Sequence, residues 1–251
     1  MRGWLKTTAH ESLFRRAARA TARLVASFTL TAALAQGSIS TAQETRQEFW
    51  PEINVYKKLD QTFRLRFLAS LTRAQETGKK TEGTLEIDLD IGVKALIRQK
   101  LRNLPDHQRG KYVTLRAGYA YIPSFGDDAD KEHRILLEGT GRYPLPLGIL
   151  VSDRSRGDLR WINGDFSTRY RNRLRVERDF EIGIVKFTPY MMGEGFYDFR
   201  KDLWSRTELQ TGVEIPLGRR PVIEFYYLRQ HNSHSQTENV NGYGIVFQLH
   251  F

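Results

Sequence analysis

A row of alternating arginines is the part of this sequence with the clearest capacity for chemistry. The row is Arg169, Arg171, Arg173 and Arg175, and Glu177 continues it. Residues two apart share one face of a β-strand, so we expect these side chains to project together. Guanidinium groups bind carboxylate, sulfate and phosphate oxygens through charge-assisted hydrogen bonds. The spacing therefore predicts either a cationic track for anionic solutes or a salt-bridged plug that holds neighbouring strands in register.

Such a row needs carboxylates nearby, because four cations on one face repel one another unless they are paired. Glutamates elsewhere in the chain could supply the partners: Glu138, Glu194, Glu208, Glu214 and Glu224. Removing one partner of a buried pair costs about 3–5 kcal/mol, so a charge-removal variant here could misfold. The residues that we expect to line a common interior are Arg169, Arg171, Arg173, Arg175, Glu177, Glu194, Arg206 and Glu208.

A second cluster combines histidine, serine and a carboxylate. The run His231-Asn232-Ser233-His234-Ser235 is followed by Glu238. A serine activated by a histidine is a common nucleophile in hydrolases. The cluster resembles the histidine–x–serine element of lipid A deacylase barrels, so the alternative hypothesis is an outer-leaflet lipid hydrolase using His231, Ser233 and Glu238. The surrounding Asn, Ser and Gly residues equally predict a polar surface loop.

Metal and cofactor chemistry has little support in the sequence. There is no cysteine, His107 and His133 are isolated, and His231 with His234 has only loop spacing. We expect no metal site and no cofactor. The formal net charge of +10 fits a basic interior or attraction to anionic lipid head groups. We expect no nucleic-acid partner, because nucleic-acid binding conflicts with the export predicted below.

The elements that must position these residues are β-strands. From Phe49 onward, apolar and polar residues alternate with a period of two, which is the pattern of a strand and not of a helix. Eleven strand-like runs follow from the alternation: 49–57, 62–72, 84–98, 111–122, 132–143, 148–162, 166–179, 184–194, 203–215, 221–230 and 242–251. Bacterial membrane barrels have an even number of strands, so we take one run to be miscounted and expect ten or twelve strands.

A membrane barrel explains these runs better than a soluble periplasmic β-sandwich, which is the rival fold. The runs are about 10–15 residues long, whereas strands in globular proteins average about 5–6, and a bilayer requires about 9–11 tilted residues. Their polar faces also carry charge, arginine above all. An arginine facing lipid at the midplane costs about 2–4 kcal/mol, so the arginine row must face the lumen.

The C-terminal run is the most specific sign of the location. Apolar residues alternate there up to a final phenylalanine, in the order Tyr243, Ile245, Phe247, Leu249 and Phe251. This pattern resembles the C-terminal signal that the outer-membrane barrel assembly machinery recognises. With a periplasmic C-terminus, the segments near 73–83, 123–131, 195–202 and 231–241 fall outside the cell. The segments near 58–61, 103–110, 144–147 and 216–220 fall in the periplasm.

The N-terminal region has the composition of a secretory leader. A basic stretch precedes an apolar run from Leu24 to Ala35, which is too short to span a bilayer and ends in small residues. The sequence therefore predicts a signal peptide over 1–35, with cleavage possible as late as residue 42. It also predicts a short periplasmic segment over 36–48 and an outer-membrane barrel over 49–251.

Most of the predicted mature chain resembles a known family. DRSRGDLRW at 153–161, RYRNRLRVER at 169–178 and GYAY at 118–121 carry the resemblance, together with Tyr190, Glu194, Phe196, Arg206 and Gly212. The family is an uncharacterised group of bacterial outer-membrane β-barrels, described only as a domain of unknown function. The resemblance implies fold and location, and it implies no activity.

We therefore expect an all-β protein: a single antiparallel transmembrane β-barrel in a bacterial outer membrane of Gram-negative type. The leading hypotheses are a narrow or plugged pore, with small anions as its candidate solutes, and a purely structural barrel, each with an arginine-lined lumen. The expected partners are outer-membrane lipid, lipopolysaccharide and the barrel assembly machinery, and the solute is not specified by the sequence.

Overall fold

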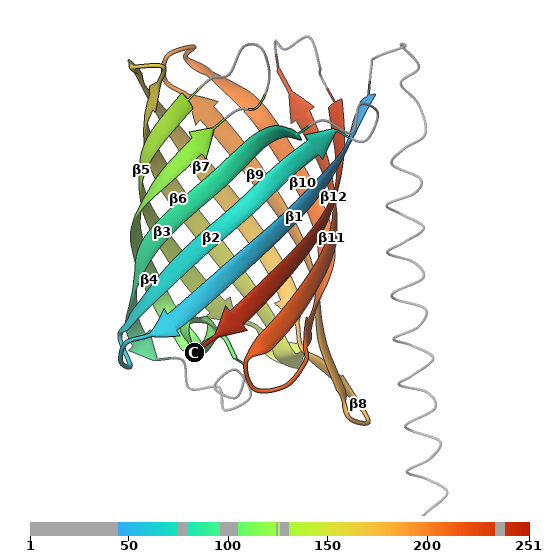
Figure 1. Ribbon diagram of the computed structural model, residues 1–251. Helices are drawn as coiled ribbons and strands as arrows, with labels where there is room; N and C mark the ends of the chain where they lie inside the picture. The colour runs from blue at the N-terminus through green and yellow to red at the C-terminus, as the bar shows by residue number, and fades with distance from the viewer. Residues whose placement is uncertain (1–44, 75–79, 96–104, 124, 126–130, 234–238) are drawn as a thin grey trace, which may run out of the picture. The chain divides into compact units, whose positions relative to one another are not determined.

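A computed structural model describes residues 45–74, 80–95, 105–123, 125, 131–233 and 239–251 (Figure 1). The predicted signal peptide and residues 36–44 lie outside this part of the chain. Residues 45–48 belong to the first strand, which begins at Thr45, so the barrel begins four residues before the expected boundary at residue 49.

The described chain is built almost entirely from long strands, as the alternation predicts. Eleven strands of 12–16 residues, one three-residue strand and two short 3-10 helices follow one another along the chain. The long strands are β1 (Thr45–Lys58), β2 (Phe63–Ala74), β3 (Lys80–Ala95), β4 (Lys111–Pro123), β5 (Lys131–Pro144), β6 (Ile149–Ile162), β7 (Asp165–Arg178), β9 (Val185–Asp198), β10 (Leu203–Pro216), β11 (Pro221–Asn232) and β12 (Asn239–His250). The short elements are η1 (His107–Gly110), η2 (Pro146–Gly148) and β8 (Phe180–Ile182).

The eleven long strands form one closed barrel, so the predicted fold class is confirmed and the even strand number is wrong. Each long strand pairs antiparallel with the next along the chain, and β8 extends only the hairpin that joins β7 to β9. An odd number of alternating strands leaves the first and last parallel. The barrel closes through such a parallel pair, β1 with β12, from Thr45 opposite Asn239 to Tyr56 opposite His250. Parallel pairing satisfies the backbone with evenly spaced hydrogen bonds, so closure does not require an even count.

The outer face of the barrel wall is apolar and its inner face is charged. A soluble β-sandwich has the opposite arrangement. Large apolar side chains point outward and are exposed: Ile53 by 52%, Leu85 by 57%, Leu137 by 59% and Leu209 by 66%. Charged side chains on the same strands point inward and are buried, including Arg66, Asp88 and Glu194. A soluble protein rarely exposes so much contiguous apolar surface, whereas a barrel in lipid requires it.

The connections gather at two mouths, which we name by the position of the C-terminus. The C-terminal mouth carries the turns after β1, β5, β7 and β10 together with η1, and Phe251 ends there (Figure 1). The opposite mouth carries the connections after β2, β4, β6, β9 and β11. The strand ends that flank the loops predicted for one side therefore meet at one mouth. No helix among the described residues has the length and hydrophobicity needed to span a bilayer.

Candidate functional site: the charged lumen

The barrel encloses a cavity of about 710 Å³ that is lined by inward side chains from all eleven long strands. Its charged lining consists of fourteen arginines and eleven aspartates or glutamates, with no lysine among the described residues. A volume of this size is typical of sites that hold small molecules. The excess of arginine gives the lining a positive balance.

The strand period positions this lining, and one tight turn sets the phase of the arginine row. Inward residues have even numbers on β6 and odd numbers on β7, because Asn163 and Gly164 join the two strands in a two-residue turn. Both turn residues have positive φ, 53° and 95°, as a type I′ hairpin requires. The resulting register places Arg154 directly opposite Arg173 and Arg156 opposite Arg171.

Like charges facing each other across a strand pair destabilise a sheet unless a counter-charge lies between them. Glu194 on β9 supplies it. The Glu194 carboxylate accepts hydrogen bonds from Arg154, Arg171 and Arg173, each at 2.6 Å. The Glu194 side chain is fully buried, whereas those of the three arginines are 14%, 14% and 25% exposed. The guanidinium groups therefore lie over the carboxylate and face the cavity. We call these four residues the Glu194 cluster.

Further carboxylates are also shared between arginines, and two of them lie towards the opposite mouth. Asp158 pairs with Arg156 at 2.6 Å and with Arg169 at 3.0 Å. Glu132 pairs with both Arg134 and Arg160 at 2.7 Å. Arg156 has a second carboxylate in Glu86 at 3.6 Å, but Arg134, Arg160 and Arg169 each have only a share of one described carboxylate, so arginine stays in excess from the Glu194 cluster towards the opposite mouth.

At the C-terminal mouth, residues 105–110, which come directly before β4, fold into the barrel and narrow it. Gln108 in η1 is fully buried, and Arg109 pairs with Glu177 at 2.8 Å and Glu214 at 2.6 Å. Asp106, the N-cap of η1, accepts a hydrogen bond from the Gln108 backbone N–H and pairs with Arg64. We call residues 105–110 the plug segment.

The plug segment also perturbs the titration of its own groups. Burial raises the pKa of Asp106, but the Arg64 guanidinium outweighs it and holds that pKa well below the usual range. Burial, with the Arg64 charge, lowers the pKa of His107 to about 4. At neutral pH, Asp106 is therefore an anion and His107 is neutral.

Comparison with known proteins identifies the family. The model of a protein family described as "Protein of unknown function (DUF2490)" matches residues 47–241. The chain belongs to the DUF2490 family. The predicted family resemblance is thus confirmed, and the family description assigns no activity. No curated protein sequence matches the chain.

Two solved structures are similar to this DUF2490 barrel. One is the β-domain of the Bordetella autotransporter BrkA, 15% identical, with a TM-score of 0.41 over 73% of this chain and 82% of that chain. The other is the NanC porin, 10% identical, with a TM-score of 0.44 over 78% of this chain and 92% of that chain.

The structure places the predicted interior residues in or directly behind the lining of the DUF2490 lumen. The lining includes Arg169, Arg171, Arg173, Arg175, Glu177, Arg206 and Glu208. Glu194 lies behind three of these arginines rather than on the cavity surface. Arg206 and Glu208 lie 3.7 Å apart, nearer the opposite mouth.

Sequence reasoning missed the plug segment. Asp106 and Arg109 stand in a connection that resembles any polar turn, and no local pattern shows that it folds inward. The only available signal was its length, because the connection between β3 and β4 runs from residue 96 to residue 110, longer than a turn between paired strands needs.

The residues of the alternative hydrolase hypothesis are only partly within the described chain. His231 is exposed, and its Nδ1 lies 3.2 Å from the Asn239 side-chain oxygen. The backbone N–H of Ser233 donates to the Ser205 carbonyl, while Glu238 lies outside the described residues. The hydrolase hypothesis therefore stays a prediction without supporting geometry.

The residues of the predicted assembly signal lie at the end of the chain, Tyr243 to Leu249 on β12 and Phe251 directly after it. Tyr243, Phe247 and Phe251 point outward and are 45%, 37% and 48% exposed. The backbone N–H of Phe251 donates to the Tyr56 carbonyl, so the last residue is held against β1. Recognition of this strand by the assembly machinery stays a prediction.

Proposed function

We propose that this protein is an outer-membrane pore for small anions, with its C-terminal mouth towards the periplasm and narrowed by the plug segment. The Glu194 cluster carries the proposal, because three guanidinium groups that border the cavity share a single buried carboxylate. The outward apolar belt supports a membrane location, and the predicted leader and C-terminal signal support the outer membrane.

A purely structural network explains the Glu194 cluster less well. Buried charges are costly unless they are paired and hydrogen-bonded, so a network that only holds strands together should balance its charges locally. The cluster does not. The buried Arg154 Nε makes no hydrogen bond to any described residue, and the three cations have a second carboxylate only in Glu138, 3.5 Å from Arg154. A passing anion would supply the missing negative charge.

Planar-bilayer recording of residues 36–251, refolded in detergent, tests the proposal. We expect discrete conductance steps and a reversal potential in a potassium chloride gradient that shows chloride carrying most of the current. Arg173→Ala should shift the reversal potential towards cation permeation, because Arg173 is the most exposed cation of the Glu194 cluster. Arg173→Lys should largely preserve the selectivity, since it keeps the charge.

Arg178→Ala provides a matched control, because Arg178 lies at the end of the same strand, is exposed and is not part of the cavity lining. It should leave the reversal potential unchanged. A silent bilayer from protein shown to be folded by strand circular dichroism and heat-dependent gel mobility would contradict the pore. Equal permeation of potassium and chloride by the wild type would contradict the anion preference.

A further inference from the structure

The charges of the lumen are segregated onto two facing walls. The inward faces of β4 to β7 form what we call the arginine wall, and those of β9 to β12 with β1 to β3 form the carboxylate wall. The arginine wall contributes ten of the lining arginines and only three lining carboxylates: Arg116, Arg134, Arg142, Arg154, Arg156, Arg160, Arg169, Arg171, Arg173, Arg175, Glu132, Glu138 and Glu177. The carboxylate wall contributes seven lining carboxylates and three arginines: Glu48, Glu52, Glu82, Glu86, Glu208, Glu214, Glu224, Arg46, Arg66 and Arg206.

Several of the closest ion pairs lie where the two walls meet. At the boundary of β7 and β9, the Glu194 cluster joins them. At the boundary of β3 and β4, Arg116 Nε lies 2.6 Å from an Asp90 carboxylate oxygen. Neighbouring strands bring opposite charges within reach there. Away from these boundaries the walls face each other across the cavity, and the Arg156–Glu86 ion pair, at 3.6 Å, joins them there.

Some groups far from the boundaries have no ionic partner among the described residues. Glu52 accepts a hydrogen bond from Asn54, and Glu224 accepts hydrogen bonds from Tyr190 and Gln248. No described arginine or lysine lies within ion-pair distance of either carboxylate. On the arginine wall, Arg142 donates to the Thr114 hydroxyl at 2.8 Å and has no ion pair with any described residue.

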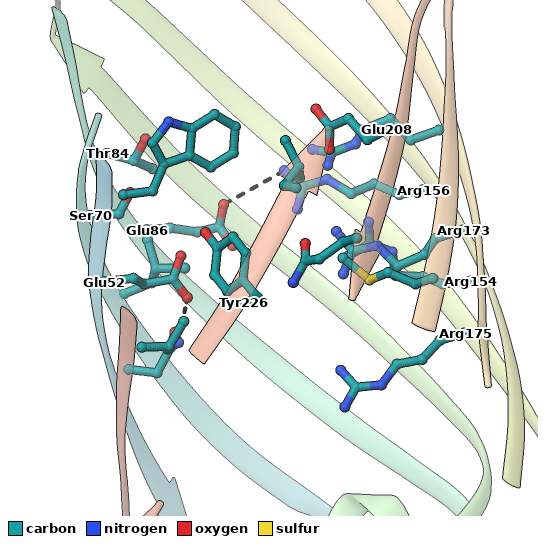
Figure 2. A pocket seen from close by; sticks show the side chains of 18 of the residues that line it. Glu52, Ser70, Thr84, Glu86, Arg154, Arg156, Arg173, Arg175, Glu208 and Tyr226 are labelled. Atoms are coloured by element: carbon teal, nitrogen blue, oxygen red, sulfur yellow. Dashed lines mark hydrogen bonds and ion pairs between the residues drawn. The ribbon is translucent and has the colours of Figure 1, made fainter. Parts of the chain in front are cut away.

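The walls confront each other directly in the middle of the lumen. Figure 2 shows Glu52 and Glu86 projecting from one side and Arg154, Arg173 and Arg175 projecting from the other. Tyr226 stands between the two groups. Opposed charges across a narrow space with low-dielectric walls produce a strong field directed across the lumen, which orients a dipolar molecule.

We infer that this lumen takes small zwitterions, with an acidic group directed to the arginine wall and an ammonium group directed to Glu52 and Glu224. The inference rests on the proposed pore and names its class of organic solute. A simple organic anion would gain from the arginine wall alone and would leave the Glu52 and Glu224 carboxylates without a counter-charge. A simple organic cation would be repelled by the ten arginines. A zwitterion aligned with the field gains from both walls, and its acidic group supplies the anion that the Glu194 cluster lacks.

Titration calorimetry on the refolded protein in neutral detergent tests the inference with three solutes of matched chain length: 4-aminobutyrate, butyrate and butylammonium. We expect 4-aminobutyrate to bind about tenfold more tightly than either singly charged solute, which is the effect of one additional favourable charge contact. The same solute should interrupt the chloride current of the pore at concentrations where the other two do not.

The double variant Glu52→Gln/Glu224→Gln separates the two walls. It should reduce the affinity for 4-aminobutyrate about tenfold, to that of butyrate, while the affinity for butyrate stays equal or rises. Glu181→Gln is the matched control, because Glu181 lies on β8, is exposed and is outside the cavity lining. It should change none of the affinities.

Butyrate binding as tightly as 4-aminobutyrate would overturn the inference, since the arginine wall would then act alone. Tightest binding of butylammonium would also overturn it. Because calorimetry does not depend on conductance, selective 4-aminobutyrate binding by a silent barrel would support the zwitterion site and contradict the pore. Chloride conductance without selective binding of 4-aminobutyrate would support the pore and contradict the zwitterion site.

Discussion

The centre of the lumen and its C-terminal mouth are made from the same two kinds of side chain in different proportions. At the mouth, Arg109 and Arg175 both pair with Glu177 and Glu214, so two cations meet two anions. At the centre, three arginines share Glu194. At the mouth the cations and anions are equal in number and neutralise one another. At the centre the arginines outnumber the carboxylate, so positive charge is available to a solute.

The number of arginines per carboxylate, and not the total number of charges, therefore distinguishes a structural network from a candidate binding surface. Pairing Arg109 with two strands far apart in the sequence ties the plug segment to β7 and β10. The Glu194 cluster does not link a separate segment to the wall in this way. Its members lie on the neighbouring strands β6, β7 and β9, which are already joined by backbone pairing.

Glu194→Gln should have the largest effect, because it removes the carboxylate that separates three mutually repelling arginines. We expect the free energy of unfolding to fall by about 3–5 kcal/mol, as for other buried charges that lose a partner. Urea unfolding in detergent, followed by strand circular dichroism, measures the change. Glu181→Gln should leave stability unchanged. A Glu194→Gln barrel as stable as the wild type would show that the central charges are solvated, and the contrast with the mouth would be lost.

Arg109→Ala should have an intermediate effect, because Glu177 and Glu214 keep Arg175 as a partner. We expect a loss of stability of about 1–3 kcal/mol and a higher single-channel conductance as the plug segment loosens. Bilayer recording at one salt concentration measures the second effect. An unchanged conductance would mean that the plug segment does not restrict the path.

Acidification should have the smallest effect on stability, and it should act through Asp106 at the C-terminal mouth. The folded-state pKa of Asp106 lies below its unfolded value of about 3.9. Its contribution to stability is therefore present above that pH and is lost as the pH falls below it. Wild-type protein should lose about 1 kcal/mol more stability than Asp106→Asn between pH 5 and pH 3, a modest difference because the Asp106 side chain is 31% exposed and partly screened by solvent. Equal losses in both proteins would remove Asp106 as the acid-sensitive contact.

Much of this architecture was predictable because alternation is a local property. A period of two assigns each side chain of a strand to one face, and the cost of arginine in lipid decides which face points inward. The eleven runs, the inward direction of Arg169 to Arg175 and the grouping of the strand ends all follow from that reasoning, and the structure agrees with them. The error in strand number came from a rule about other barrels, and not from the sequence pattern itself.

The sequence by itself therefore determined the strands, the polarity of their two faces and the family. Only the tertiary structure decided the parallel closure of β1 on β12, the inward fold of the plug segment, the three arginines on Glu194 and the separation of charge between two walls. The physical reason is that these features depend on which residues meet across a register or across the lumen. Those meetings join positions such as Arg109 and Glu214, about a hundred residues apart, and no local pattern encodes them.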